Sequence, residues 1–142
     1  MNNNLVDSHC HLNFPQFKEN LDKVIDRASQ AGVINMLTIS IKLNDAKTLR
    51  QITKKYPQIY HSIGVHPHEC KNYQEVTVKE LIDYANDPKC IGIGETGLDF
   101  YYENSPKEIQ KNLFSIHIET SRKLNLPLII HTRNADKETI EI

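Results

Sequence analysis

Five short apolar runs alternate with four segments of helical periodicity, and this alternation restricts the fold more than any other feature of the chain. The runs are rich in β-branched residues and lie at 5–11, 33–41, 59–66, 90–99 and 126–133. The segments between them place apolar residues at helical spacing and lie at 20–32, 44–57, 77–88 and 105–125. Strands that alternate with helices in this way predict an α/β protein whose βα units feed a parallel sheet.

Local signals mark several boundaries of these elements. Gly32 predicts the end of the first helix, and Pro88 predicts a stop after the third. Ser105 and Glu108 have the spacing of a capping box, which predicts the start of the fourth helix. The last nine residues, NADKETIEI, predict the start of a fifth helix. A barrel of eight βα units needs about 250 residues, and this chain has 142.

The composition fits one soluble globular domain over residues 1–142. Hydrophobic residues make up 39% of the chain and charged residues 25%, and no apolar run is long enough to cross a membrane. We find no secretory signal, and the three scattered cysteines form no CxxC pair, so we expect reduced thiols and a cytoplasmic location. The net charge of −1 gives no overall basic field, so nucleic-acid binding would need a local patch or bound metal.

Polar side chains gather where the predicted strands end. In parallel α/β proteins, chemistry gathers at the carboxyl ends of the strands. Four of the five runs end in residues that can bind metal or phosphate, and these are His9, His11, His66, His68, Glu95, Asp99, His131 and Arg133. The second run offers only Thr38 and Ser40. This convergence predicts a site at one edge of the sheet.

The HxH motif has a simple geometric reading. Side chains at i and i+2 point to the same face of a strand, so Asp7, His9 and His11 share one face and Cys10 points away. Two imidazoles on one face can bind one divalent ion. The alternative is that one histidine is a hydrogen-bonded core residue.

The fourth run carries two carboxylates. Glu95 is surrounded by glycines, which allow close backbone approach beside a site. It could bridge two metal ions, or it could be a helix cap or a surface carboxylate. Asp99 could hydrogen-bond a metal ligand or could form a structural turn, because we expect the strand to end before Gly97.

The remaining candidate site residues also have more than one possible role. His131 ends an apolar run and must bind a metal or find a core partner. Arg133 suits a phosphate through its fork of donors, or a surface ion pair. His66 could contact substrate, donate a proton or cap its loop. His61 and His117 are expected to be structural.

The neighbours of these residues leave further alternatives open. Tyr101 and Tyr102 could stack on a base or sugar, or could pack the loop. His68 could likewise contact substrate, donate a proton or cap the loop. No nucleophile elbow, P-loop or dinucleotide-binding motif occurs in the sequence.

Four segments together resemble a known family. DSHCHLNF, IGVHPHE, IGETGLDFYY and LPLIIHTRNA are similar, in order, to the motifs of the TatD-type metal-dependent deoxyribonucleases, which are amidohydrolase-like TIM barrels. HxH alone is shared by many metallohydrolases, whereas GETGLD and HTR at this spacing are much more specific.

The resemblance implies a (β/α) barrel with one to three divalent ions at its carboxyl face that hydrolyses phosphodiester bonds of DNA. Imidazole and carboxylate ligands suit Zn and Mn, and phosphodiester chemistry often uses Mg, so the residues leave Mg, Zn and Mn open. His9 and His11 would hold one ion, and His131 would hold a second. Glu95 would bridge the two ions and so act as the catalytic ligand. Asp7 and Asp99 would hydrogen-bond the ligands, while His66 and Arg133 would lie near the substrate phosphate.

The chain also departs from the family pattern. The family supplies a further histidine after strand six and an aspartate near strand eight, and the sequence ends at Ile142 before either. We therefore expect the N-terminal portion of a barrel, truncated to about five βα units. Its open strand edges would invite self-association. Two alternatives to a DNase remain: an inactive metal- or phosphate-binding module, and an amidohydrolase-type enzyme acting on small molecules.

Overall fold

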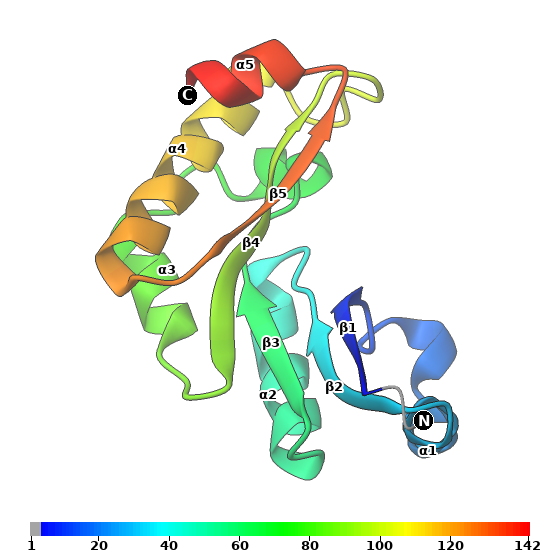
Figure 1. Ribbon diagram of the computed structural model, residues 1–142. Helices are drawn as coiled ribbons and strands as arrows, with labels where there is room; N and C mark the ends of the chain where they lie inside the picture. Colours follow the sequence, from blue (N-terminus) through cyan, green and yellow to red (C-terminus); the bar gives the residue numbers. More distant parts are fainter. Residues whose placement is uncertain (1–3) are drawn as a thin grey trace.

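The computed structural model describes residues 4–142, which form one curved parallel sheet with helices packed against it (Figure 1). The strands follow one another in chain order across the sheet, and every neighbouring pair is parallel. They are β1 (Leu5–Cys10), β2 (Val33–Thr38), β3 (Ile59–Ile63), β4 (Cys90–Asp99) and β5 (Leu128–Arg133). All five carboxyl ends therefore lie at the same edge of a half-barrel, as the alternation of elements predicts.

The helices also fall where the sequence predicts them. The α-helices are α1 (Leu21–Gln30), α2 (Ala46–Lys55), α3 (Val78–Ala85), α4 (Lys107–Leu124) and α5 (Asp136–Glu141). Three short 3-10 helices, η1 (Pro15–Phe17), η2 (Leu43–Asp45) and η3 (Pro67–Asn72), were not expected. No helix among residues 4–142 is long and apolar enough to cross a membrane.

Two details of the sequence-based description are wrong. β4 does not end before Gly97 but continues to Asp99, because Gly97 keeps its place in the register opposite His131 of β5. Ser105 does not cap α4: the residue before that helix is Pro106, and no side chain caps it. The capping box lies instead at Thr77 and Glu80, at the start of α3.

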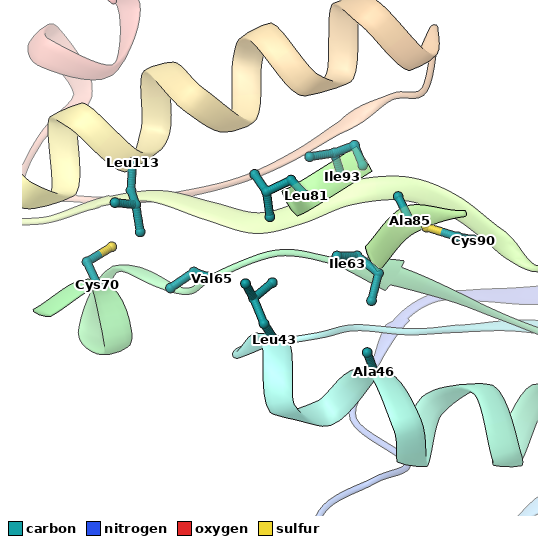
Figure 2. Close-up of a cluster of buried hydrophobic side chains, with 10 residues drawn as sticks. All are labelled: Leu43, Ala46, Ile63, Val65, Cys70, Leu81, Ala85, Cys90, Ile93 and Leu113. Carbon is teal, nitrogen blue, oxygen red and sulfur yellow. The ribbon is translucent and has the colours of Figure 1, made fainter. Parts of the chain in front are cut away.

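The core lies between the sheet and the helices. Figure 2 shows the larger cluster, in which side chains of β3 and β4 meet those of α2, α3 and α4. A second cluster joins β2 and β3 to α1 and α2 through Met36, Ile59, Ile25 and Ile52. Burial of this apolar surface is the main force that holds the helices against the sheet. The helices therefore hold the strands, and the strand ends carry the polar residues described below.

Candidate metal centre

The carboxyl ends of β1, β4 and β5 bring together the residues that the sequence places in a metal site. His9, His11 and Glu95 each offer a ligand atom, and these three atoms lie within 4.8 Å of one another. Glu95, His66 and His131 form a second group that meets the same criterion. Glu95 belongs to both groups, which is the geometry expected of a bridging carboxylate.

The first group is arranged to receive a cation. Nε2 of His9 lies 3.4 Å from Oε2 of Glu95. Nδ1 of His11 lies 3.2 Å from the carbonyl oxygen of Ile39. A carbonyl can only accept a hydrogen bond, so Nδ1 of His11 carries the proton and Nε2 keeps its lone pair. Two ligands that each lie about 2.1 Å from a tetrahedral ion are about 3.4 Å apart, so the donor set fits a divalent ion.

His131 approaches the other oxygen of Glu95. Its Nδ1 lies 3.3 Å from Oε1 of Glu95, and its Nε2 lies 3.1 Å from Oδ2 of Asp99. A neutral His131 that donates Nε2–H to Asp99 presents a lone pair at Nδ1. That lone pair and the Glu95 oxygen would then be two acceptors facing each other. A proton or a metal ion between them is needed to make this contact favourable.

His66 belongs to the second group by distance, but its hydrogen bonds give it another role. Its Nδ1 accepts the backbone N–H of His68 at 3.2 Å, so the proton of a neutral ring lies on Nε2. Nε2 lies 3.3 Å from Nδ1 of His131 and 4.0 Å from Oε1 of Glu95. Burial lowers the pKa of His66 to about 4, which keeps the ring neutral at pH 7. His66 therefore offers an N–H donor rather than a lone pair.

The charges of the site follow from these contacts. Burial raises the pKa of Glu95, but its hydrogen bond with His131 and the nearby imidazoles outweigh burial, so the pKa is lowered. The same hydrogen bond raises the pKa of His131. Glu95 is thus an anion at neutral pH, and a metal ion at His131 would compete with the proton that Glu95 and Asp99 stabilise there.

Asp99 makes hydrogen bonds of both kinds that the sequence left open. Its Oδ2 accepts hydrogen bonds from Nε2 of His68 at 2.8 Å and from Nε2 of His131 at 3.1 Å. Its Oδ1 accepts the backbone N–H groups of Tyr101 and Tyr102, each at 3.1 Å, and so forms a turn. A carboxylate that orients an imidazole in this way fixes the tautomer presented to a metal.

Two residues hold the segments that carry Asp99 and His68, and the sequence did not reveal these roles. Gln110 of α4 accepts the backbone N–H of Asp99 at 2.8 Å, and its side-chain amide donates to the carbonyl oxygen of Asp99 at 3.2 Å. Ser105 donates to the carbonyl oxygen of His68 and accepts the N–H of Lys71. Both side chains are buried. A polar residue on the apolar face of a predicted helix is the only signal that could have found Gln110.

The hydrogen bonds to Asp99 predict a loss of stability in acid. Burial raises the pKa of Asp99, but the N–H of Tyr102 and the two imidazoles outweigh it and lower the pKa from 3.8 to about 2. Because the folded pKa lies below the unfolded one, the stabilisation is complete above about pH 4 and is lost as the pH falls toward 2. We expect urea titrations to show a loss of about 2 kcal/mol over this range. Asp99→Asn should remove that pH dependence, and an unchanged acid profile in the variant would contradict the assignment.

The remaining site residues lie around this centre. Arg133 lies at the rim, where its side chain is 46% exposed and its Nη1 is 4.0 Å from Oδ2 of Asp99. Asp7 contacts no imidazole in the described residues: its Oδ1 accepts the backbone N–H of His9 at 3.1 Å. His117 is fully buried and accepts the N–H of Val65, and His61 is also fully buried, as expected for structural residues.

Comparison with known proteins finds one matching family model and several similar sequences. The family model described as TatD related DNase matches residues 6–142. A metal-dependent hydrolase of Buchnera aphidicola, described as uncharacterized, is 39% identical over 97% of this chain and 56% of its own length. A protein of Escherichia fergusonii named 3'-5' ssDNA/RNA exonuclease TatD is 30% identical over 97% of this chain and 53% of its own.

Solved structures give the same fold. A TatD homolog from Escherichia coli K12 superposes with a TM-score of 0.91 over 99% of this chain and 55% of that chain, at 24% identity. A TatD family hydrolase from Entamoeba histolytica superposes with a TM-score of 0.85 at 26% identity. The chain spans about half the length of the relatives it matches.

Proposed function

Because the chain belongs to the TatD related DNase family, we propose that it forms the metal-binding half of a hydrolase that cleaves phosphodiester bonds in DNA. One observation carries this proposal. Glu95 directs one oxygen toward His9 and the other toward His131, so one carboxylate joins two groups of imidazole nitrogens. Such paired sites are typical of enzymes that act on phosphodiesters.

Different residues of the chain would bind the metal ions, orient a metal ligand and contact the phosphate. His9, His11 and Glu95 would hold the first ion, and Glu95 and His131 would supply ligands to a second. Bound ions would lower the pKa of water and stabilise charge on the phosphoryl oxygens. Asp99 orients His131 by accepting its Nε2–H. His66 can donate its Nε2–H to a phosphate oxygen, and Arg133 can pair with the same group from the rim.

The donor set leaves three metals as candidates. Imidazole ligands suit zinc and manganese, whereas phosphodiester chemistry often uses magnesium. The three cysteines are free thiols, in keeping with the cytoplasmic location that we propose.

A nuclease assay tests the proposed function. We expect the purified chain to cleave DNA when Mg²⁺, Mn²⁺ or Zn²⁺ is added, and His9→Ala and Glu95→Ala to abolish cleavage. Glu119→Gln is a matched control, because Glu119 pairs with Lys123 on the surface of α4. Cleavage that persists in both site variants would contradict the proposal.

A second candidate is a module that binds metal without hydrolysis. The observation that favours it is the ligand count: residues 4–142 supply two imidazoles and Glu95 to one ion, but only His131 and Glu95 to the other. The resemblance assigns two further ligands to positions beyond a fifth strand. Metal binding by calorimetry without any cleavage would favour this candidate over the enzyme.

We also propose that the 142-residue chain associates with itself through its strand edges. β1 and β5 each pair on one side only among the described residues, and Val6 and Ile130 beside these edges are 60% and 51% exposed. Unpaired apolar edges promote pairing between chains. We expect concentration-dependent sedimentation, which the double substitution Val6→Lys and Ile130→Lys should suppress. A monomer at every concentration would overturn this proposal.

A further inference from the structure

Tyr101 and Tyr102 lie beside the candidate metal centre, and both side chains are largely exposed. Their exposed fractions are 62% and 54%. Packing into the loop, which was one of the two sequence-based alternatives, would have buried them. A pair of exposed aromatic rings next to a polar site is the kind of surface that contacts a ligand.

The backbone below the two rings is held by the carboxylate that orients His131. Oδ1 of Asp99 accepts the N–H groups of Tyr101 and Tyr102, while Oδ2 accepts Nε2–H of His131. The backbone that carries the two rings is therefore fixed relative to a candidate metal ligand. A ligand group placed on the rings would sit close to the metal centre.

The ring of Tyr101 has few contacts, whereas the ring of Tyr102 has a cation beside it. The ring of Tyr102 meets those of His68 and Tyr101 edge-on, with centroids 5.6 and 4.7 Å apart. The guanidinium carbon of Arg133 lies 5.2 Å from the Tyr102 centroid. Within residues 4–142, Tyr101 has no aromatic or cationic partner other than Tyr102. Its ring is thus available for stacking.

We propose that Tyr101 and Tyr102 form a platform for an unpaired nucleobase, in which the open ring of Tyr101 stacks on the base and the ring of Tyr102, perpendicular to it, supports that ring. Arg133, beside Tyr102, would hold the adjoining phosphate. The proposal rests on the proposed function, since it assumes a nucleic-acid substrate. Aromatic side chains bind single strands by stacking on the faces of bases, and the arginine fork suits phosphate oxygens. Bases inside a duplex are already stacked on their neighbours, so only an unpaired base can reach the ring of Tyr101.

Binding to strands with and without bases tests the platform. The probes are a labelled single-stranded oligothymidylate and an abasic strand of equal length, both with phosphorothioate linkages and in the presence of Mg²⁺. By fluorescence anisotropy, we expect the unchanged chain to bind the oligothymidylate more tightly. Tyr101→Ala and Tyr102→Ala should each weaken that binding about tenfold and leave the abasic strand unaffected.

Conservative and distant variants serve as controls. Tyr101→Phe and Tyr102→Phe keep the ring and should retain binding. Tyr84→Ala removes a tyrosine that is 36% exposed on α3, away from the site, and should also bind normally.

Each contrary result has a distinct meaning. Equal affinity of the unchanged chain for both strands would overturn the platform and leave phosphodiester recognition standing. A loss in the phenylalanine variants as large as in the alanine variants would also overturn it, because the ring face would then not be the binding element. Failure to bind either strand would overturn the proposed nucleic-acid substrate together with the platform.

Discussion

Glu95→Gln should lower the affinity for Mn²⁺ or Zn²⁺ by more than about a hundredfold. Removing a group that only orients a metal ligand costs roughly 10- to 100-fold in affinity, and Glu95 is placed to be a ligand itself. The substitution keeps the size of the side chain but removes the negative charge that faces both His9 and His131. Isothermal titration calorimetry measures the change directly, and any hydrolysis should be lost with the metal.

The control for this prediction is Glu119→Gln, which removes an equal charge from the surface of α4 and should leave metal affinity unchanged. Circular dichroism should show that both variants fold. Metal affinity in a folded Glu95→Gln protein equal to that of the unchanged chain would contradict the assignment of Glu95 as a ligand.

Gly97→Ala should be the most destabilising single substitution among those considered. Gly97 has a φ of 138°, which side chains rarely adopt. An added Cβ would lie 2.1 Å from the carbonyl oxygen of His131. That oxygen belongs to the backbone of β5, so it cannot rotate away as a side chain can. We expect a loss of at least about 4 kcal/mol in the free energy of unfolding, measured by urea denaturation.

Gly92→Ala provides the contrast within the same strand. A Cβ at Gly92 would meet Cδ1 of Ile129 at 2.9 Å, and the end of that flexible side chain can move. We expect a much smaller loss of stability. Similar unfolding free energies for the two variants would show that β4 and β5 do not pair in the register seen here.

The alternation of apolar runs and helical segments was sufficient to predict the order of the five strands and five helices. It worked because periodicity reflects which faces of each element are buried. The same reasoning placed His9, His11, Glu95 and His131 at one edge, since parallel strands bring their carboxyl ends together. The close approach of these residues follows from local spacing and topology alone.

Contacts between distant segments could not be predicted in this way. Ser105 and Gln110 lie near the start of α4 in the sequence. In the structure, the buried amide of Gln110 fixes the backbone of Asp99, and Ser105 fixes the segment that carries His68. Nor could spacing assign the tautomer of His66, which depends on a backbone N–H two residues later. The contacts of Gln110 and Ser105 depend on tertiary packing and the tautomer of His66 on the local backbone conformation, and a pattern of residue types encodes neither.

The central claim is that His9, His11 and Glu95 hold one divalent ion while Glu95 and His131 face a second. Anomalous X-ray diffraction from crystals of the chain soaked in Mn²⁺ or Zn²⁺ tests it most directly. The account predicts an anomalous peak about 2.1 Å from Nε2 of His9, Nε2 of His11 and an oxygen of Glu95. A metal peak elsewhere in the molecule, with none beside Glu95, would contradict it.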